Sequence, residues 1–360
     1  MTRGDDCAPS DEDFGFLEEA SSMRNRYRLE IRMDAAVACL AACVSGLSVP
    51  AFAGATITTF DPPGAVLTHP EGINASGVIT GYYEDGSQTY HGFVRNSDGT
   101  IISFDVTESI NTAASAINRS GTIAGCYIDP NSVYHGYLRA PDGTFTIFDT
   151  KGSCPVSINS HGDVAGILHK RDGTSHGYER KSNGKMAVFD PPGSTFTQTA
   201  SINDEGSIAG NFVDGSGESH GFLRTSDGVI TAFDPSGSQD TEPAGINRYG
   251  EIAGSFQIPG NIAAYDGFLR AGDGTFTIFG VPGDNATIPF AMNDKQDTAG
   301  ACSDDSSPAH GFLRTSAGKI SVFDPPGSIE TIPLSVNNDR TIVGYYTADG
   351  FNFHGFVRTR

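Results

Sequence analysis

Apolar and polar residues alternate in short runs along the chain from residue 55 onward. Within one stretch, the runs GTIAGCYI, YHGYLR and GTFTIFD follow one another at 121–128, 134–139 and 143–149. Alternation with a period of two over four to eight residues is typical of strands with one buried face. The breaks between the runs carry Gly, Pro, Asn and Asp, which are the residues of tight turns. We therefore predict an all-β protein built from many short strands.

One phrase of this pattern recurs seven times. The phrase consists of an apolar residue and Asn, a turn Gly, an Ala-Gly pair, His-Gly-aromatic-x-Arg, Asp-Gly and Phe-Asp, with substitutions in individual copies. The Asn of the seven copies stands at Asn74, Asn118, Asn159, Asn203, Asn247, Asn293 and Asn337. Each copy contains four predicted strands, and pairs such as Asp98-Gly99 suit a hairpin between the third and the fourth. A period of about 44 residues with four strands per copy predicts a seven-bladed β-propeller.

The two ends of the repeat array complement each other. The last copy stops after HGFVR at 354–358, so it lacks a fourth strand. The segment ATITTFDPPG at 55–64 is a fourth strand without a blade of its own. Pairing the two would close the ring and cover an exposed sheet edge. We therefore predict that residues 54–360 form one propeller, closed by the N-terminal strand.

The first 53 residues have the features of a secretory signal. Arg24, Arg26, Arg28 and Arg32 precede a short apolar run that ends in Ala51-Phe52-Ala53, an A-x-A cleavage pattern. The segment before Met23 is acidic, which does not suit a signal, so translation starting at Met23 or Met33 is expected. A lipoprotein box ending in Cys43 is the less favoured alternative. The predicted location is extracellular or periplasmic.

The net charge limits the classes of binding partner, and the cysteine content limits the possible disulfides. The formal net charge of -20 disfavours binding to nucleic acid and to anionic membrane surfaces. No membrane span is expected, and we expect a monomer. Cys126, Cys154 and Cys302 remain after the predicted cleavage. They permit one disulfide, with Cys126–Cys154 the favoured pair, or else three buried free thiols.

The repeated phrases resemble a known family. IN-x-x-G-x-I-A-G and HGF-x-R-x-x-DG-x-x-x-x-FD are similar to the HAF repeats of bacterial extracellular repeat proteins, over residues 55–360. The resemblance implies an exported repeat protein and specifies no reaction. The fifth copy departs from the phrase, because Asp266 replaces His and Gly280 replaces Asp. Any site that needs complete sevenfold symmetry is therefore in doubt.

The repeated polar residues favour architecture over catalysis. Six copies place a histidine at the same point, whereas an enzyme normally needs one placed acid or base. We expect these imidazoles to form hydrogen bonds between strands or blades. An aspartate ends six of the fourth strands, at Asp61, Asp105, Asp149, Asp190, Asp234 and Asp324. These are expected to bond turn backbone, or alternatively to form an acidic binding face together with the variable loops between the second and third strands.

His69, Glu71 and Glu242 are among the polar residues that the repeat does not require, as is the loop at 169–172. We take the first three as candidate binding residues, with solvated loop residues as the alternative. The segments at 214–218 and 304–305 offer oxygen ligands for calcium without the spacing of a known calcium loop, so no cofactor or metal is predicted. Nucleophile-elbow, H-E-x-x-H, P-loop and C-x-x-C motifs are absent from residues 54–360.

These observations favour binding over catalysis. The expected function is an exported recognition or structural module whose rim loops bind an extracellular carbohydrate or protein. The rival is a secreted hydrolase or lyase that uses His69 or Glu71, with or without a divalent cation.

Overall fold

The described part of the chain is built from strands alone. The structure is a computed structural model that describes residues 54–360, except for 262–263, 305–307 and the side chain of Asp149. The predicted signal segment, with its start sites and Cys43, lies outside the described residues. The described residues form 28 strands and no helix, which confirms the all-β prediction.

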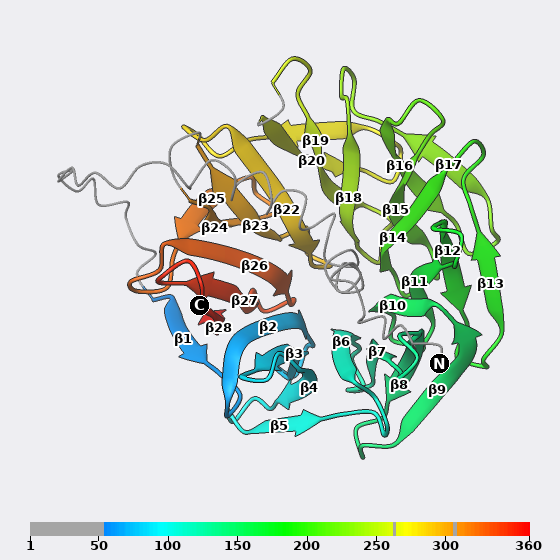
Figure 1. The fold of residues 1–360 in the computed structure, drawn as a ribbon. Helices are drawn as coiled ribbons and strands as arrows, with labels where there is room; N and C mark the ends of the chain where they lie inside the picture. Colours follow the sequence, from blue (N-terminus) through cyan, green and yellow to red (C-terminus); the bar gives the residue numbers. More distant parts are fainter. Residues whose placement is uncertain (1–53, 262–263, 305–307) are drawn as a thin grey trace, which may run out of the picture. The chain divides into compact units, whose positions relative to one another are not determined.

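The strands follow one another in the order of the repeats (Figure 1). Their bounds are β1 (Thr56–Phe60), β2 (Ala65–Ile73), β3 (Ile79–Asp85), β4 (Tyr90–Arg95), β5 (Ile101–Phe104), β6 (Asn111–Ile117), β7 (Ile123–Ile128), β8 (Tyr134–Arg139), β9 (Phe145–Lys151), β10 (Ser153–Ile158), β11 (Val164–His169), β12 (Ser175–Arg180), β13 (Met186–Phe189), β14 (Phe196–Ile202), β15 (Ile208–Val213), β16 (Ser219–Arg224), β17 (Ile230–Phe233), β18 (Thr241–Ile246), β19 (Ile252–Gln257), β20 (Tyr265–Arg270), β21 (Phe276–Phe279), β22 (Ala286–Met292), β23 (Thr298–Ser303), β24 (His310–Arg314), β25 (Ile320–Phe323), β26 (Glu330–Val336), β27 (Ile342–Thr347) and β28 (Phe353–Thr359).

Four antiparallel strands are the repeating element of the sheets. Three sheets have four strands each, and two have eight strands, each made of two four-stranded sets. The sets of an eight-stranded sheet are joined by one parallel pair, Leu67 with Phe353 or Tyr265 with Ala286. β1 pairs with β28 from Thr56↔Thr359 to Phe60↔Gly355. The orphan N-terminal strand therefore supplies the fourth strand that the last copy lacks.

The first strand of each set carries a bulge that suits its small residues and prolines. In β2 the register shifts between Pro70 and Gly72, and the other first strands shift at the equivalent place. A bulge is one of the few sheet positions that tolerate proline. The small residue after it lies against the next first strand, where Ser157 Oγ accepts the Ile202 N–H at 3.2 Å.

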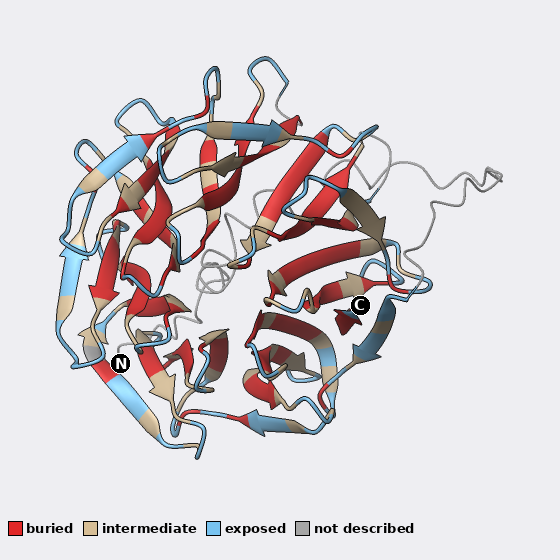
Figure 2. Cartoon of the chain, turned by 180° about the vertical axis from the view of Figure 1, so that it is seen from behind, coloured by how far each residue is buried: buried red, intermediate tan, exposed pale blue. Residues whose placement is uncertain are grey.

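The aromatic residue and the arginine of the His-Gly-aromatic-x-Arg phrase bind consecutive sets together. The aromatic side chain is fully buried in every copy, as for Phe93 and Phe222. Each arginine lies over the fourth-strand Phe of the preceding set, at 4.3 to 4.9 Å from the ring centroid. One such pair joins the chain ends, because Arg95 lies over Phe60 of β1. The first and second strands are largely buried, whereas the fourth strands are exposed (Figure 2).

The seven repeated asparagines are buried and link neighbouring sets. Asn74 Oδ1 accepts the N–H groups of Ser76 and Val78, both at 3.0 Å. Its Nδ2 donates to the carbonyl of Asn118, the asparagine of the next copy. The same donation recurs from Asn118, Asn159, Asn203, Asn293 and Asn337, the last one reaching the carbonyl of Asn74. Asn247 departs, since its Nδ2 donates to Glu251 at 2.6 Å. A side-chain amide can accept hydrogen bonds from the turn N–H groups and donate one to the neighbouring set. This explains why the repeat requires Asn at this buried position.

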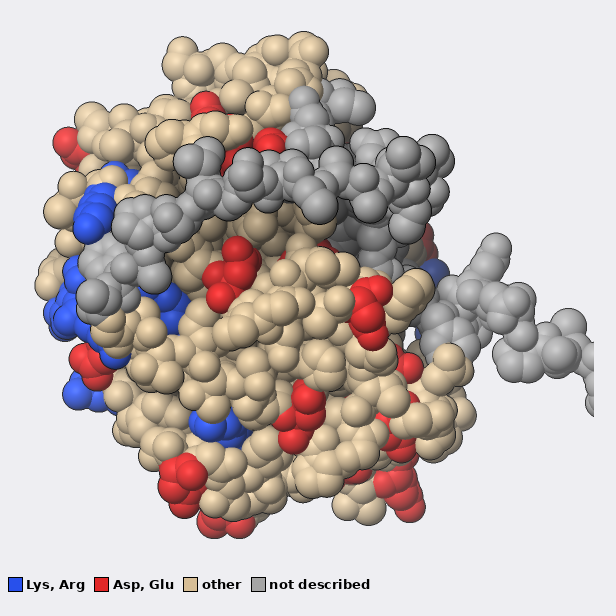
Figure 3. All heavy atoms as spheres, turned by 90° about the vertical axis from the view of Figure 1, so that its left-hand side faces the viewer, with Lys and Arg blue, Asp and Glu red and all other residues tan. Residues whose placement is uncertain are grey.

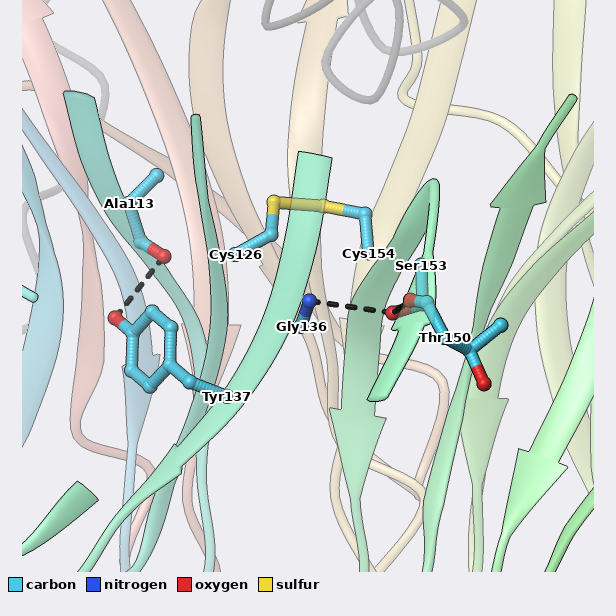
Figure 4. Close-up of a disulfide and its surroundings, with 7 residues drawn as sticks. All are labelled: Ala113, Cys126, Gly136, Tyr137, Thr150, Ser153 and Cys154. Carbon is cyan, nitrogen blue, oxygen red and sulfur yellow. Dashed lines mark hydrogen bonds between the residues drawn. A yellow bond between two sulfur atoms is a disulfide. The ribbon is translucent and has the colours of Figure 1, made fainter. Parts of the chain in front are cut away.

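One disulfide joins two neighbouring sets. Cys126 of β7 is bonded to Cys154 of β10 (Figure 4), which confirms the favoured pairing. Beside it, Ser153 Oγ accepts the Gly136 N–H at 3.2 Å and donates to the Thr150 carbonyl at 2.7 Å. Cys302 is a buried free thiol, and burial raises its pKa, so it does not present a reactive thiolate.

Acidic side chains are spread over the described surface in Figure 3, while basic ones gather toward one edge. No described segment forms a helix long and apolar enough to cross a bilayer.

Candidate functional site

The repeated histidines are bound to the repeated aspartates. In five copies the imidazole Nδ1 at the start of the third strand lies 2.7 to 2.9 Å from the carboxylate that ends the fourth strand. The couples are His91–Asp105, His176–Asp190, His220–Asp234, His310–Asp324 and His354–Asp61. Each couple ties two strands of one set, and His354–Asp61 ties β28 to the residue after β1. The expected hydrogen bonding of the histidines between strands is thereby confirmed.

The aspartates bond side chains rather than the turn backbone that we expected. Besides their histidines, Asp61 and Asp190 accept the hydroxyls of Thr68 and Thr197 at 2.6 and 2.7 Å. Each of these two carboxylates therefore has both an imidazole and a hydroxyl group as partners. Asp149 belongs to β9, and its side chain lies outside the described residues.

Loop carboxylates reach the same histidines. Asp85 and Asp214, from the loops between the second and third strands, lie 3.5 Å from Nε2 of His91 and His220. His135 bonds Asp129 of its own loop at 3.1 Å. The loops between second and third strands therefore share one rim with the ends of the fourth strands. This geometry agrees with a shared acidic rim, although its role in binding stays a prediction.

The fifth set lacks this couple at both positions. Asp266 stands in place of the histidine, and Gly280 removes the carboxylate that would repel it. Burial raises the pKa of Asp266. Both members of the couple are therefore replaced in this set, and Asp266 faces no second carboxylate at position 280.

A second group of positions varies from copy to copy, and we call it the variable layer. It consists of the residue five before each repeated Asn, its pairing partner on the second strand, and the residue immediately before the position of the repeated histidine. His69 and Glu242 occupy the same position in their copies, which the sequence pattern did not reveal. The others at that position are Ala113, Cys154, Gln198, Ile288 and Ile332. The layer therefore holds two of the three irregular residues that sequence analysis selected.

The layer is rich in polar and aromatic side chains that contact each other. Gln257 donates to the hydroxyl of Tyr265, and Asn211 donates to that of Ser219, both at 3.1 Å. Next to the layer, His169 lies 3.0 Å from the Ser175 hydroxyl, and burial lowers the pKa of this histidine to about 4. It is therefore neutral at pH 7.

The layer is most aromatic where the first and last copies meet. His69 is 2% exposed and stacks on Tyr82 at a centroid distance of 5.0 Å and an interplanar angle of 7°. On its other side lie Tyr345 at 4.4 Å and Phe353 at 6.0 Å, both from the last copy. Tyr90 contacts Tyr82 edge-on at 5.8 Å. We call these five residues the junction cluster.

Two carboxyl groups lie on the strands of the junction cluster. Glu84 pairs with Tyr90 across β3 and β4, and burial raises its pKa even though the Tyr90 hydroxyl bonds to it. Glu71 lies half-buried in the β2 bulge, two residues from His69. A half-buried carboxyl group beside a tyrosine, as Glu84 is beside Tyr90, can accept hydroxyl or amide donors from a ligand.

The sequence did not single out Tyr90, Phe353 or the neighbouring Glu84. Tyr90, Glu84 and Phe353 are ordinary strand residues in a single copy, and they become distinctive only when equivalent positions of all copies are compared. Tyr83 and Tyr346, which follow Tyr82 and Tyr345, stack instead on the structural His91 and His354.

The calcium candidates of the sequence are described only in part. Asp214 Oδ1 accepts the N–H groups of Ser216 and Glu218, as expected of a turn residue. Asp305 lies outside the described residues, and no group of three or more metal-ligating side chains occurs in the rest of the described chain.

Comparison with known proteins identifies the fold. No family model and no curated protein matches this chain. Among solved structures, it is similar to a catalytically inactive virginiamycin B lyase from Staphylococcus aureus bound to quinupristin, with 15% identity, a TM-score of 0.60, and coverage of 85% of this chain and 99% of that one. It is also similar to the β-propeller domain of the trilobed protease from Pyrococcus furiosus, with 10% identity, a TM-score of 0.58, and coverage of 81% and 95%. The chain therefore has a β-propeller fold, and at these identities the likeness extends no further.

Proposed function

We propose that the chain is an exported, non-enzymatic recognition module that binds an extracellular carbohydrate or protein at the rim of a closed seven-bladed propeller. The observation that carries this proposal is that the chain has two kinds of position, those that repeat in each copy and those that vary between copies. Repeated residues join the sets, whereas the exposed loops between the second and third strands differ in every copy. A constant scaffold with variable residues on one rim is typical of a binding protein.

Two contacts across the chain ends support the closed ring. Asn337 donates to the Asn74 carbonyl at 3.2 Å, and Arg95 lies over Phe60 at 4.9 Å. Both repeat the contacts that join sets consecutive in the chain. The β1–β28 pairing adds a strand that both ends of the chain share.

Export is the second part of the proposal. A disulfide between neighbouring sets is typical of proteins in an oxidising compartment. The A-x-A pattern at 51–53 is typical of the cleavage site of a secretory signal peptide. Recovery of the protein in the medium or periplasm, with Gly54 near its new N-terminus, is the expected result of fractionation followed by N-terminal sequencing.

A thermal-shift panel tests the binding function directly. The exported protein is screened against neutral and acidic oligosaccharides, envelope proteins and divalent cations, because a ligand that binds the folded state raises the melting temperature. Replacing the loops between second and third strands should abolish the shift. Absence of any shift or capture across envelope and matrix components would contradict the proposal.

The same panel, scored for turnover, separates binding from catalysis. Turnover abolished by His69→Ala but retained by His220→Ala would replace recognition with a hydrolase or lyase function. His220 is the matched control because its partners, Asp234 and Asp214, belong to the repeated rim couples.

A further inference from the structure

The junction between the first and last copies presents aromatic surface together with hydrogen-bonding groups. Tyr82 and Tyr90 are half-exposed at the end of a row of five rings that runs through His69 and Tyr345 to Phe353. The buried members fix the exposed ones, since each ring contacts the next. At the same layer position, the other copies carry Cys126, Ile167, Asn211, Ser255 and Ala301 in place of Tyr82 and Tyr345. The aromatic row is therefore a local addition to the repeat.

The loop that precedes Phe353 carries a further aromatic side chain. Phe351 lies two residues before Phe353, and its side chain is 84% exposed, the highest value among the large apolar side chains of the described residues. Asp349 accepts the N–H groups of Phe351 and Asn352 at 2.9 and 2.8 Å, and the Asn352 side chain at 2.7 Å. These bonds hold the pKa of Asp349 well below its usual range and order the loop. An exposed aromatic side chain on an ordered loop loses little entropy when a ligand covers it.

The negative net charge of the molecule favours neutral over acidic ligands among those that have a planar apolar face. A pyranose ring offers an apolar face for stacking and hydroxyl groups for carboxylates, whereas the acidic surface repels uronic acids and sulfated glycans. Glu84 and Glu71 accept hydrogen bonds and, when ionised, cannot donate them, so they favour ligands rich in donors.

We propose that the junction cluster and Phe351 form the binding site of a neutral oligosaccharide, with Tyr82, Tyr90 and Phe351 as stacking residues and Glu84 and Glu71 as hydroxyl acceptors. This inference rests on the proposed recognition function and specifies its ligand class and its place. His69 is a positioning residue here, because it is buried between Tyr82 and Tyr345.

The test is calorimetric titration of the exported full-length product with neutral oligosaccharides of glucose, mannose, xylose and N-acetylglucosamine, and with oligogalacturonate. At least one neutral sugar should bind, and Phe351→Ala and Tyr82→Ala should each weaken its binding about tenfold or more. Tyr249→Ala is the matched control, since Tyr249 is 63% exposed in the turn between β18 and β19 and should leave binding unchanged. Phe351 is exposed enough that its loss leaves the melting temperature unchanged, so weaker binding by that variant reports the site.

The outcomes separate the site from the broader function. Binding of a neutral sugar that neither Phe351→Ala nor Tyr82→Ala weakens would overturn the site and leave recognition standing. Binding of oligogalacturonate alone, or of an envelope protein alone, would overturn the ligand class. Lack of binding to every sugar would overturn this inference, and lack of any partner in the thermal-shift panel would overturn the proposed function as well.

Discussion

At the residue scale, the same residue type has two different roles in this chain. His91, His176 and His220 are rim histidines fixed by carboxylates, whereas His69 and His169 lie in or beside the variable layer among aromatic and hydroxyl groups. Repetition identifies the first role, because a structural bond is needed in each copy. The second role is identified by histidines, such as His69, that occur at positions where the other copies have different residues.

The His220 couple predicts a pH dependence of stability. Burial alone would lower the pKa of His220, but the hydrogen bonds and charges of Asp234 and Asp214 outweigh it, so the pKa is raised. The unfolded-state pKa is about 6.5. Because the folded-state value is higher, the charged couple stabilises the fold fully below pH ~6.5, and this contribution is lost as the pH rises through the folded-state pKa. Urea unfolding should therefore show a larger loss of stability in His220→Gln at pH ~5.5 than at pH ~8.5. An equal loss at both values would show that the imidazole acts only by packing.

At the element scale, the four-stranded sets are joined by contacts that recur at every boundary, and two boundaries carry something more. The disulfide lies between β7 and β10, and the junction cluster lies between β2–β4 and β27–β28. The disulfide and the junction cluster both consist of residues of the variable layer, whose side chains differ from copy to copy.

Removing the disulfide should destabilise the folded chain without changing the fold. The bond closes a loop with a sequence separation of 28, for which chain entropy predicts a contribution of about 3–4 kcal/mol to the free energy of unfolding. Cys126→Ser/Cys154→Ser should lower the urea midpoint accordingly, and reductant should destabilise the wild type but leave the double variant unchanged. A wild type insensitive to reductant would contradict this role.

Sequence analysis predicted the repeat, the four strands of each copy, the partner of the orphan strand and the disulfide, because each leaves a local or periodic signal. Asp98-Gly99 shows this, since Gly99 has a φ of 92° in the predicted hairpin. The junction cluster could not be predicted, because it joins residues such as Tyr82 and Tyr345 that are distant in sequence. The role of the repeated asparagines was missed for a similar reason, as Nδ2 of Asn74 bonds a carbonyl 44 residues away.

At the scale of the whole molecule, the proposed site depends on how the chain ends meet. Tyr82 and Tyr90 come from the first copy, and Tyr345, Phe351 and Phe353 come from the last. An open ring would separate these groups, whereas a closed ring holds the buried rings of Tyr345 and Phe353 against His69 of the first copy. We therefore expect β1 to hold the first and last copies together.

The most direct test is hydrogen exchange on the exported protein, comparing wild type with Phe60→Ala. Phe60 lies 6.0 Å from Phe93, beneath Arg95 and beside Gly355. Phe189→Ala is the matched control, because Phe189 makes the same contacts with Phe222 and Arg224 inside the continuous chain. We predict faster exchange in β28 and β4 for Phe60→Ala, and unchanged exchange there for Phe189→Ala. Unchanged protection of β28 and β4 in Phe60→Ala would contradict closure of the ring by β1.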